Sequence, residues 1–157
     1  MPKITPFLWF HDDAEEAMKF YVSLFKGSKI LDVARLEGAP GTPPGKATTV
    51  TARIADQEVT ALNGGPEFTF NESFSFSVSC ESQQEVDELW QKLTANGGEE
   101  SQCGWLKDRY GLSWQIVPRV LPEMLQDKDP AKARRVMDAM LKMRKIDIAA
   151  LERARAA

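Results

Sequence analysis

The sequence predicts an α+β protein made of two successive modules followed by a helical C-terminal extension. Each half of the first 126 residues has the order strand, helix, strand, strand, strand. The helix-start patterns at Asp12 and Ser82, each followed three residues later by a glutamate, lie 70 residues apart. A repeated order at a fixed spacing indicates a tandem duplication. We expect modules at about 1–65 and 66–126, which form one domain, and the extension at 127–157.

The first module begins with an apolar strand and a helix. Ile4–Phe10 is apolar on both faces, which predicts a well-buried strand. Asp12 with Glu15 forms a capping box and predicts that Asp12 caps the helix, which ends near Gly27. A second strand follows, and then a hairpin; these elements are expected at 29–36, 47–55 and 58–63. The segment Glu37–Lys46 contains three prolines and three glycines, so we expect an irregular loop and a candidate lid.

The second module ends in a hairpin whose strands alternate clearly. Trp105–Lys107 and Leu112–Val117 are joined by a turn at 108–111, where Asp108 and Arg109 are expected to stabilise the hairpin. From residue 112 onward, Leu112, Trp114 and Ile116 point to one face, and Ser113, Gln115 and Val117 to the other. The alternation predicts a strand with one face on the core, and it makes Gln115 the polar centre of the other face.

A row of serines marks the strand at Phe74–Cys80. Its apolar residues share one face, and the opposite face carries the serines 73, 75, 77 and 79. A strand buried on both faces would not carry a row of hydroxyl groups, so this face is wet or lines a cavity. A plain solvent-exposed sheet face is the structural alternative.

Composition limits the function classes. At 157 residues with 43% hydrophobic content the chain is long enough for one domain with a real core. The net charge of −3 gives no reason to expect nucleic acid as a partner. Residues 127–157 carry +4, which indicates a solvated basic helical face, with a polyanion site as a lesser alternative. No apolar run is long enough to span a membrane and no signal segment opens the chain, so a cytoplasmic location is expected.

Four segments resemble one known family. They are HDDAEEAMKFY (11–21), ALNGG (61–65), GWLKDRYGLSWQIVP (104–118) and KMRKIDIAALERA (142–154). Together with the tandem modules, they resemble the PhnB-like branch of the vicinal-oxygen-chelate superfamily, which includes glyoxalases and bleomycin-resistance proteins. The resemblance implies that the eight strands form one curved mixed sheet, a half-open trough, and that the chain is a homodimer. Members of this branch are often labelled methyltransferases, but no glycine-rich loop opens a helix after a strand here.

The resemblance also places the metal-ligand positions of the superfamily's enzymes. They fall on Pro6, near Ala61 or Asn63, on Ser73 and on Gln115. Pro6 and Ala61 have no ligand atom in the side chain, and a serine hydroxyl is a poor ligand for Zn or Ni. Only Gln115 is a plausible ligand, so we expect neither a metal nor a cofactor.

The leading hypothesis is therefore a metal-free cavity that binds a small molecule of unknown identity, with or without catalysis. The expected contact residues combine apolar walls with orienting polar groups: Leu8, Phe10, Trp105, Asn63, Ser73, Ser75 and Gln115. The first alternative is a metal-dependent lyase or dioxygenase of the glyoxalase type. The second is an interaction module that uses the basic C-terminal helices.

Other polar residues have simpler interpretations. His11 is the only histidine and lies at a helix entry, where structural or solvent-exposed roles are more common than catalysis. Cys80 and Cys103 are expected to be free thiols, and Cys103 would need a nearby cation to be reactive. Trp9, Trp90 and Trp114 are expected in the core that faces the helices.

Overall fold

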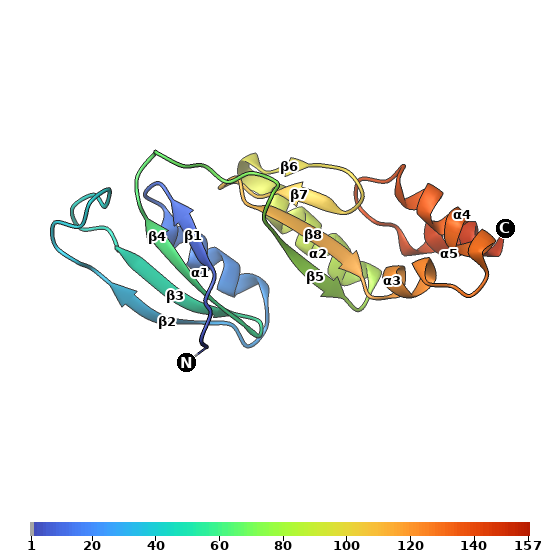
Figure 1. The fold of residues 1–157 in the computed structure, drawn as a ribbon, viewed down its shortest axis with the longest axis horizontal. Coiled ribbons are helices and arrows are strands. Elements are labelled where there is room, and N and C mark those ends of the chain that lie inside the picture. Colours follow the sequence, from blue (N-terminus) through green and yellow to red (C-terminus); the bar gives the residue numbers. More distant parts are fainter. Residues whose placement is uncertain (1) are drawn as a thin grey trace. The chain divides into compact units, whose positions relative to one another are not determined.

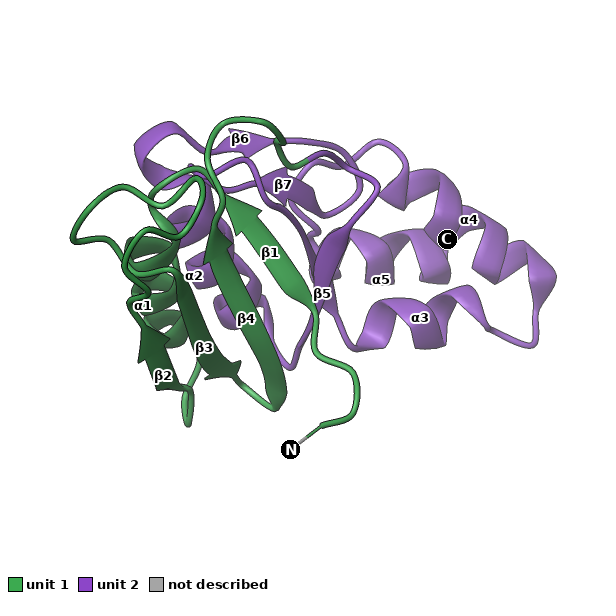
Figure 2. Cartoon of the chain, turned by 60° about the vertical axis from the view of Figure 1, so that its left-hand side comes forward, with its two compact units in different colours: residues 1–70 green, residues 71–157 purple. Residues whose placement is uncertain are grey.

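The computed structural model describes residues 2–157 and divides into two compact units. The first unit extends to Phe70 and the second begins at Asn71 (Figure 2). The second unit includes the whole C-terminal extension. The linker 66–74 forms no helix or strand.

The first unit has one helix packed on a four-stranded sheet (Figure 1). Its elements are β1 (Phe7–Phe10), α1 (Ala14–Leu24), β2 (Lys29–Ala34), β3 (Thr49–Ile54) and β4 (Gln57–Asn63). The strand order is β1-β4-β3-β2, in which β1 runs parallel to β4 and the other pairs are antiparallel.

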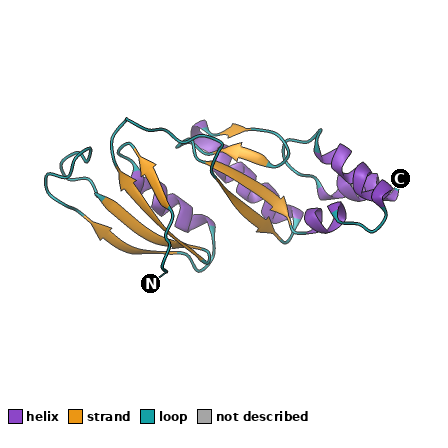
Figure 3. Cartoon of the chain, in the orientation of Figure 1, coloured by secondary structure: helices purple, strands orange, loops and turns teal. Residues whose placement is uncertain are grey.

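The second unit repeats this topology and adds helices at its end (Figure 3). Its elements are β5 (Ser75–Cys80), α2 (Gln83–Thr94), a 3₁₀ turn η1 (Ala95–Gly97), β6 (Glu99–Glu100), β7 (Trp105–Lys107), β8 (Ser113–Pro118), α3 (Val120–Leu125), α4 (Pro130–Met140) and α5 (Ile148–Ala156). The order β5-β8-β7-β6, with β5 parallel to β8, matches that of the first sheet.

The predicted fold class is confirmed: two βαβββ modules with mixed sheets are followed by C-terminal helices. The strands form two four-stranded sheets and not the one curved eight-stranded sheet that the resemblance implies, because each strand forms its hydrogen bonds within its own module.

Strand β1 is less buried than its apolar sequence predicts. It begins at Phe7, and the residues from Ile4 to Pro6 form no strand. Phe7 is 63% exposed, whereas Leu8 and Phe10 are buried. An edge strand has a neighbour on only one side, and the helix covers only one face of this sheet. The prediction that both faces of β1 are buried is therefore wrong.

The N-terminus of α1 is capped from a distance. Asp13, not Asp12, is the residue that precedes the helix, and its side chain makes no capping hydrogen bond. The backbone N–H of Ala14 instead donates to Asn63 Oδ1 over 2.9 Å, from the end of β4. Glu15 pairs with Lys19 and Arg35 rather than with the backbone. The predicted capping box at Asp12 is wrong, because a buried amide from another element supplies the acceptor.

The helix α2 begins as its sequence predicts. Ser82 accepts a hydrogen bond from the N–H of Glu85, and the carboxylate of Glu85 accepts one from the N–H of Glu81. The C-terminal helices α4 and α5 also start at side-chain caps, Asp129 and Asp147. In each of these three starts the capping side chain is a near neighbour in sequence of the N–H that it accepts, and the capping box predicted at Ser82 is confirmed.

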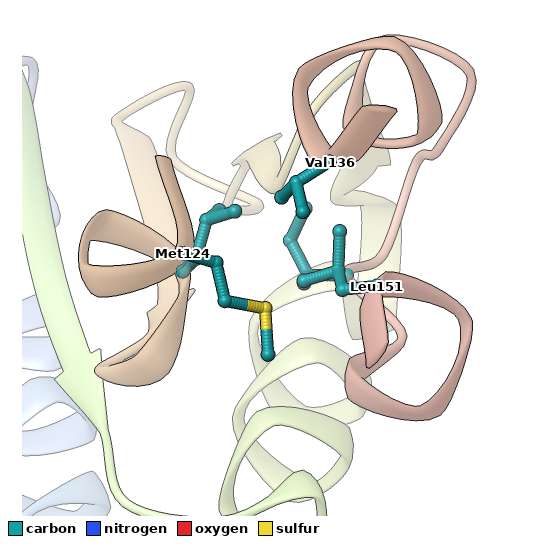
Figure 4. Close-up of a cluster of buried hydrophobic side chains, with 5 residues drawn as sticks. Met124, Val136 and Leu151 are labelled. Carbon is teal, nitrogen blue, oxygen red and sulfur yellow. The ribbon is translucent and has the colours of Figure 1, made fainter. Parts of the chain in front are cut away.

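The three C-terminal helices share a small core of their own. Figure 4 shows Met124, Val136 and Leu151 meeting between α3, α4 and α5. Leu121 and Ile146 complete this buried cluster. Gln83, in the first turn of α2, joins the cluster to the module: its Nε2 donates to the carbonyl of Ile146, and its Oε1 accepts from the N–H of Ile148.

The segment before α5 also holds the start of β7. The N–H groups of Cys103 and Gly104 donate to the carbonyls of Met143 and Arg144 over 2.8 and 2.7 Å. Gly104 has φ +86°, and a Cβ there would lie 3.0 Å from the carbonyl oxygen of Ile116. The extension is thus fixed to the same hairpin that carries the candidate site.

Candidate functional site

The second sheet has one face toward α2 and one polar face. Trp90 of α2 donates from Nε1 to Glu100 over 2.7 Å, and Glu100 is paired in register with Leu106. Leu106, Trp114 and Ile116 are buried on this helix-facing side. By strand alternation, the opposite face carries their neighbours in sequence.

We call that opposite side the serine face. The register places Ser75 beside Ser113, Ser77 beside Gln115, Trp105 beside Gln115, and Lys107 beside Ser113. The serine face is therefore made of the following residues of β5, β7 and β8: Ser75, Ser77, Ser79, Trp105, Lys107, Ser113, Gln115 and Val117. Alternation in β8, read from the sequence, predicts this face correctly.

Gln115 is half-buried at the centre of the serine face. Its Nε2 donates to Ser75 Oγ over 3.0 Å, so two of the predicted polar contact residues lie together. Within residues 2–157, the Oε1 of Gln115 accepts no hydrogen bond from the protein. An amide held by one hydrogen bond keeps an acceptor and a second donor hydrogen for another molecule.

Ser113 is the most unusual polar group of this face. Ser113 is 1% exposed, and within residues 2–157 its Oγ has no hydrogen-bond partner. A buried hydroxyl without a partner costs about 1–3 kcal/mol, so such groups are uncommon unless they have a role. Ser113 lines a cavity of about 170 Å³ together with residues of β6, β7 and the segment before β5; they are Glu72, Glu99, Glu100, Ser101, Trp105, Leu106 and Lys107.

Charged side chains stand at the rim of this cavity. Lys107 forms an ion pair and hydrogen bond with Glu72. The hydrogen bond from Lys107 lowers the pKa of the Glu72 carboxyl from its ordinary value. The same bond, together with the charges of Glu72 and Glu99, raises the pKa of Lys107. Both partners are therefore charged at neutral pH, and the rim contains one ammonium and more than one carboxylate.

The turn between β7 and β8 fixes the geometry of the hairpin. Asp108 is 2% exposed. Its Oδ1 accepts from the N–H groups of Tyr110 and Leu112, and its Oδ2 accepts from Trp114 Nε1. The prediction that Asp108 stabilises this turn is confirmed.

Leu8, Phe10 and Asn63 lie on the helix-facing side of the first sheet. Asn63 bonds to Ala14 of α1, and the register aligns Phe10 with Asn63. All three predicted contact residues are buried. Asn63 also donates to the carbonyl of Ala47, so its amide already has structural partners on both sides. The structure therefore assigns these residues to the core beneath α1.

Trp9 is on the other face of β1 and not in the helix-facing core as predicted. It is half-buried, its Nε1 donates to the carbonyl of Gly65, and its ring packs edge-on against Phe68 at 4.9 Å. The predicted contact residue Ser73 is exposed in the segment before β5, where both its N–H and its hydroxyl bond to Asn71. Ser73 is thus separate from the cluster around Gln115.

The four family metal positions do not form a coordination set. Pro6 has no donor side chain, the positions at Ala61 and Asn63 face α1, and Ser73 bonds to Asn71. Gln115 alone offers a suitable oxygen, and one amide does not hold a divalent ion. In the described residues 2–157, no three His, Cys, Asp or Glu side chains are grouped for a metal. The residues present do not fit the metal centre of the superfamily's enzymes.

His11 is exposed at the start of α1, and its Nε2 lies 3.0 Å from the carbonyl oxygen of Phe68. This contact ties the helix entry to the segment after β4.

The loop 37–46 has no regular structure, as predicted. Thr42 donates to the carbonyl of Asn63, and Gly41 packs so closely on Gly64 that a Cβ would lie 2.1 Å from its carbonyl oxygen. That the loop acts as a lid stays a prediction.

Both cysteines are free, as predicted. Burial, followed by the charges of Glu85 and Glu81, raises the pKa of the Cys80 thiol to about 12. Since the thiolate is the reactive form, we expect iodoacetamide at about pH 8 to modify the half-buried Cys103 and to leave Cys80 unmodified. Peptide mass spectrometry of the native protein measures this; equal labelling of both residues would contradict the burial of Cys80.

Sequence reasoning missed part of the site. Alternation puts Ser113 on the correct face, but it does not predict Ser113 as a contact residue. The sequence does not show whether the hydroxyl of a serine has a hydrogen-bond partner in the fold. Glu72 and Glu99 come from segments without a pattern, and only the pairing of β6 with β7 brings Glu99 beside Lys107.

No helix formed by residues 2–157 is both long and apolar enough to cross a membrane.

The repeated β1-β4-β3-β2 topology defines a protein of the vicinal-oxygen-chelate fold. The family model described as 3-demethylubiquinone-9 3-methyltransferase matches residues 2–117. The chain belongs to this family, which is PhnB-like. The match ends at β8, so α3, α4 and α5, and with them the motif at 142–154, lie outside it.

Solved structures agree with this assignment. A putative 3-demethylubiquinone-9 3-methyltransferase, PhnB protein, from Bacillus cereus is 34% identical, with a TM-score of 0.68 over 74% of this chain and 99% of that one. The protein PA1353 from Pseudomonas aeruginosa is 19% identical, with a TM-score of 0.62 over 75% and 98%, and shows the fold alone. No curated protein matched the sequence.

Proposed function

We propose that the chain binds a small molecule on the serine face of its second module, without a metal ion. The observation that carries the proposal is the pair of polar groups left for a partner, the Ser113 hydroxyl and the Oε1 of Gln115. Of the predicted contact residues, the proposal keeps Ser75, Trp105 and Gln115, and it adds Ser113. Hydroxyl and amide groups beside an aromatic ring are typical of a site that orients an organic ligand.

The two alternatives have less support. A glyoxalase-type metalloenzyme would need ligands that Pro6, Ala61 and Ser73 do not provide. An interaction module built on the C-terminal helices stays a prediction, and the apolar side chains of Met137 on α4 and of Leu141 at its C-terminal cap are exposed. The methyltransferase activity in the family's description is not part of the proposal, since no glycine-rich turn opens α1 or α2.

We also propose that the working form is a homodimer in the cytoplasm, without nucleic acid or membrane as a partner. Exposed aromatic side chains on the first module, Phe7 at 63% and Phe68 at 59%, support association. The free thiols of Cys80 and Cys103 support a reducing compartment. Light scattering that gives a particle of 17.6 kDa at micromolar concentration would remove the dimer.

The function is tested by a ligand screen followed by one substitution. A thermal-shift screen identifies ligands, because bound ligand raises the free energy of unfolding. For a ligand so found, Gln115→Ala is expected to weaken binding by about 1–3 kcal/mol, roughly 5- to 150-fold in Kd, since a polar group of the ligand loses its partner. Isothermal titration calorimetry measures the change.

The matched control is Gln84→Ala, which removes an exposed glutamine on α2 whose side chain donates a hydrogen bond to Glu88. Its Kd should equal that of the unmodified protein. Gln115→Ala should also keep the fold, because Gln115 is half-buried and has one side-chain hydrogen bond. Unchanged affinity in Gln115→Ala would remove the serine face as the site.

A further inference from the structure

We propose that the cavity beside Ser113 receives a primary ammonium group, so that the ligand of the serine face is an organic amine. This inference rests on the proposed function and names the chemical class of its ligand. At about 170 Å³ the cavity is below the usual 300–1,000 Å³ of a whole ligand site. It therefore holds one end of a ligand whose remainder extends along β8 toward Gln115.

The charge of the rim selects a cation. Among the ionisable residues that line the cavity, Glu100 has its carboxylate turned toward α2, where it accepts from Trp90 and lies 3.7 Å from Arg144. Glu99 is paired in register with Lys107 and so shares the face of Ser113. The rim on that face thus has the carboxylates of Glu72 and Glu99 against the single ammonium of Lys107.

The ion pair of Lys107 shows that the rim of this cavity binds an ammonium group. Lys107 binds Glu72 directly, and its pKa is raised by Glu72 and by Glu99. One carboxylate is used in that pair, and Glu99 has no ion pair of its own among the described residues. One negative charge is therefore left over beside a cavity whose lining includes Ser113.

The Ser113 hydroxyl is the second, independent observation. Its Oγ is buried without a partner among residues 2–157, and Ser113 is one of the residues that line the same cavity as Glu99 and Trp105. An ammonium group has three donors and no acceptor, so a hydroxyl oxygen and carboxylates are its natural partners. Trp105 adds an aromatic ring to the lining, and aromatic faces attract cations. An anion would find one already paired lysine and an excess of carboxylates.

The experiment uses the full chain and three small probes of similar size: ethanolamine, ethylene glycol and glycolate. Backbone amide shifts of Trp105 and Ser113 are followed by two-dimensional NMR at constant ionic strength. Ethanolamine should shift both amides along a saturable curve. Ethylene glycol should need a higher concentration, and glycolate should leave both amides unmoved. Equal or tighter binding of ethylene glycol or glycolate, or no saturable shift with ethanolamine, overturns the inference.

Two matched variants locate the charge. Glu99→Gln should weaken the binding of ethanolamine by roughly two- to fivefold, since it removes the unpaired carboxylate. Glu100→Gln removes the same charge from the adjacent residue and keeps an acceptor for Trp90, so its effect should be much smaller. If Glu99→Gln and Glu100→Gln weaken the binding of ethanolamine equally, the binding depends on the overall negative charge of the region. That result would overturn the assignment of the ammonium group to this cavity.

Ser113→Ala separates binding from folding. It should weaken ethanolamine and should leave the melting temperature equal or higher, because the hydroxyl it removes has no partner in the fold. A lower melting temperature with unchanged ethanolamine binding would make Ser113 structural and overturn its role. If the serine face binds a neutral or anionic ligand that depends on Gln115, the proposed function stands while the amine inference fails.

Discussion

Replacing Asp108 by alanine is expected to destabilise the protein by roughly 3–5 kcal/mol. The carboxylate is 2% exposed and accepts hydrogen bonds from the N–H groups of Tyr110 and Leu112 and from Trp114 Nε1. Leu112 and Trp114 are themselves buried, so the truncated variant leaves donors without partners. Each such donor costs about 1–3 kcal/mol, which is why the sum is large. Urea unfolding followed by far-ultraviolet circular dichroism measures the loss.

Two further variants identify the cause. Asp108→Asn keeps one oxygen but turns an NH₂ group toward either Trp114 or the two backbone N–H groups. Its free energy of unfolding should therefore lie between those of the unmodified protein and of Asp108→Ala. Asp56→Ala is the control, an exposed aspartate in the turn between β3 and β4, and should change stability by less than about 0.5 kcal/mol. A loss below about 1 kcal/mol in Asp108→Ala would show that this carboxylate does not hold the hairpin.

The alternation of polar and apolar residues predicts which face of β8 is buried, but it fails for β1, where such alternation is absent. In β8, polar and apolar residues alternate, so the sequence itself shows which residues face α2 and which form the serine face. In β1 all four residues, Phe7–Phe10, are apolar, and either face could be the buried one. Leu8 and Phe10 were predicted as pocket walls, but they face α1, and Phe7 and Trp9 occupy the other side.

Local caps are predictable and distant caps are not. Ser82, Asp129 and Asp147 each accept from an N–H within the next few residues, and the capping box at Ser82 is visible in the sequence. The cap of α1 comes from Asn63, 49 residues away from Ala14. No pattern near α1 shows that an amide from β4 lies beside the helix start, so the sequence alone predicts Asp12 as the cap.

The candidate site divides in a similar way. Gln115 and Ser75 meet as expected, because strand pairing at adjacent positions follows from the module topology. The unpartnered state of Ser113 depends on what surrounds it in three dimensions, and the excess carboxylate depends on the register of β6 with β7. The C-terminal extension was predicted as helices, but its attachment through Gln83 requires a contact between residues more than 60 positions apart.

Asn63 offers the clearest contrast between a ligand contact and a structural amide. Asn63→Ala is expected to destabilise the protein by roughly 2–4 kcal/mol, because it removes the cap of α1 and leaves the N–H of Ala14 and the carbonyl of Ala47 buried without partners. Thermal and urea unfolding measure the loss. Affinity for any ligand of the serine face, measured where the variant is folded, should not change.

Asp12→Ala is the matched control for the cap of α1. Asp12 is exposed and does not cap the helix, so its loss should stay below about 0.5 kcal/mol. Asn63→Asp keeps an acceptor for the N–H of Ala14 but sets a buried carboxylate against the carbonyl of Ala47. Its free energy of unfolding should therefore be lower than that of Asp12→Ala. If Asp12→Ala proves more destabilising than Asn63→Ala, the cap is local after all. If Asn63→Ala instead keeps full stability and loses ligand affinity, then Asn63 serves the ligand and not the helix.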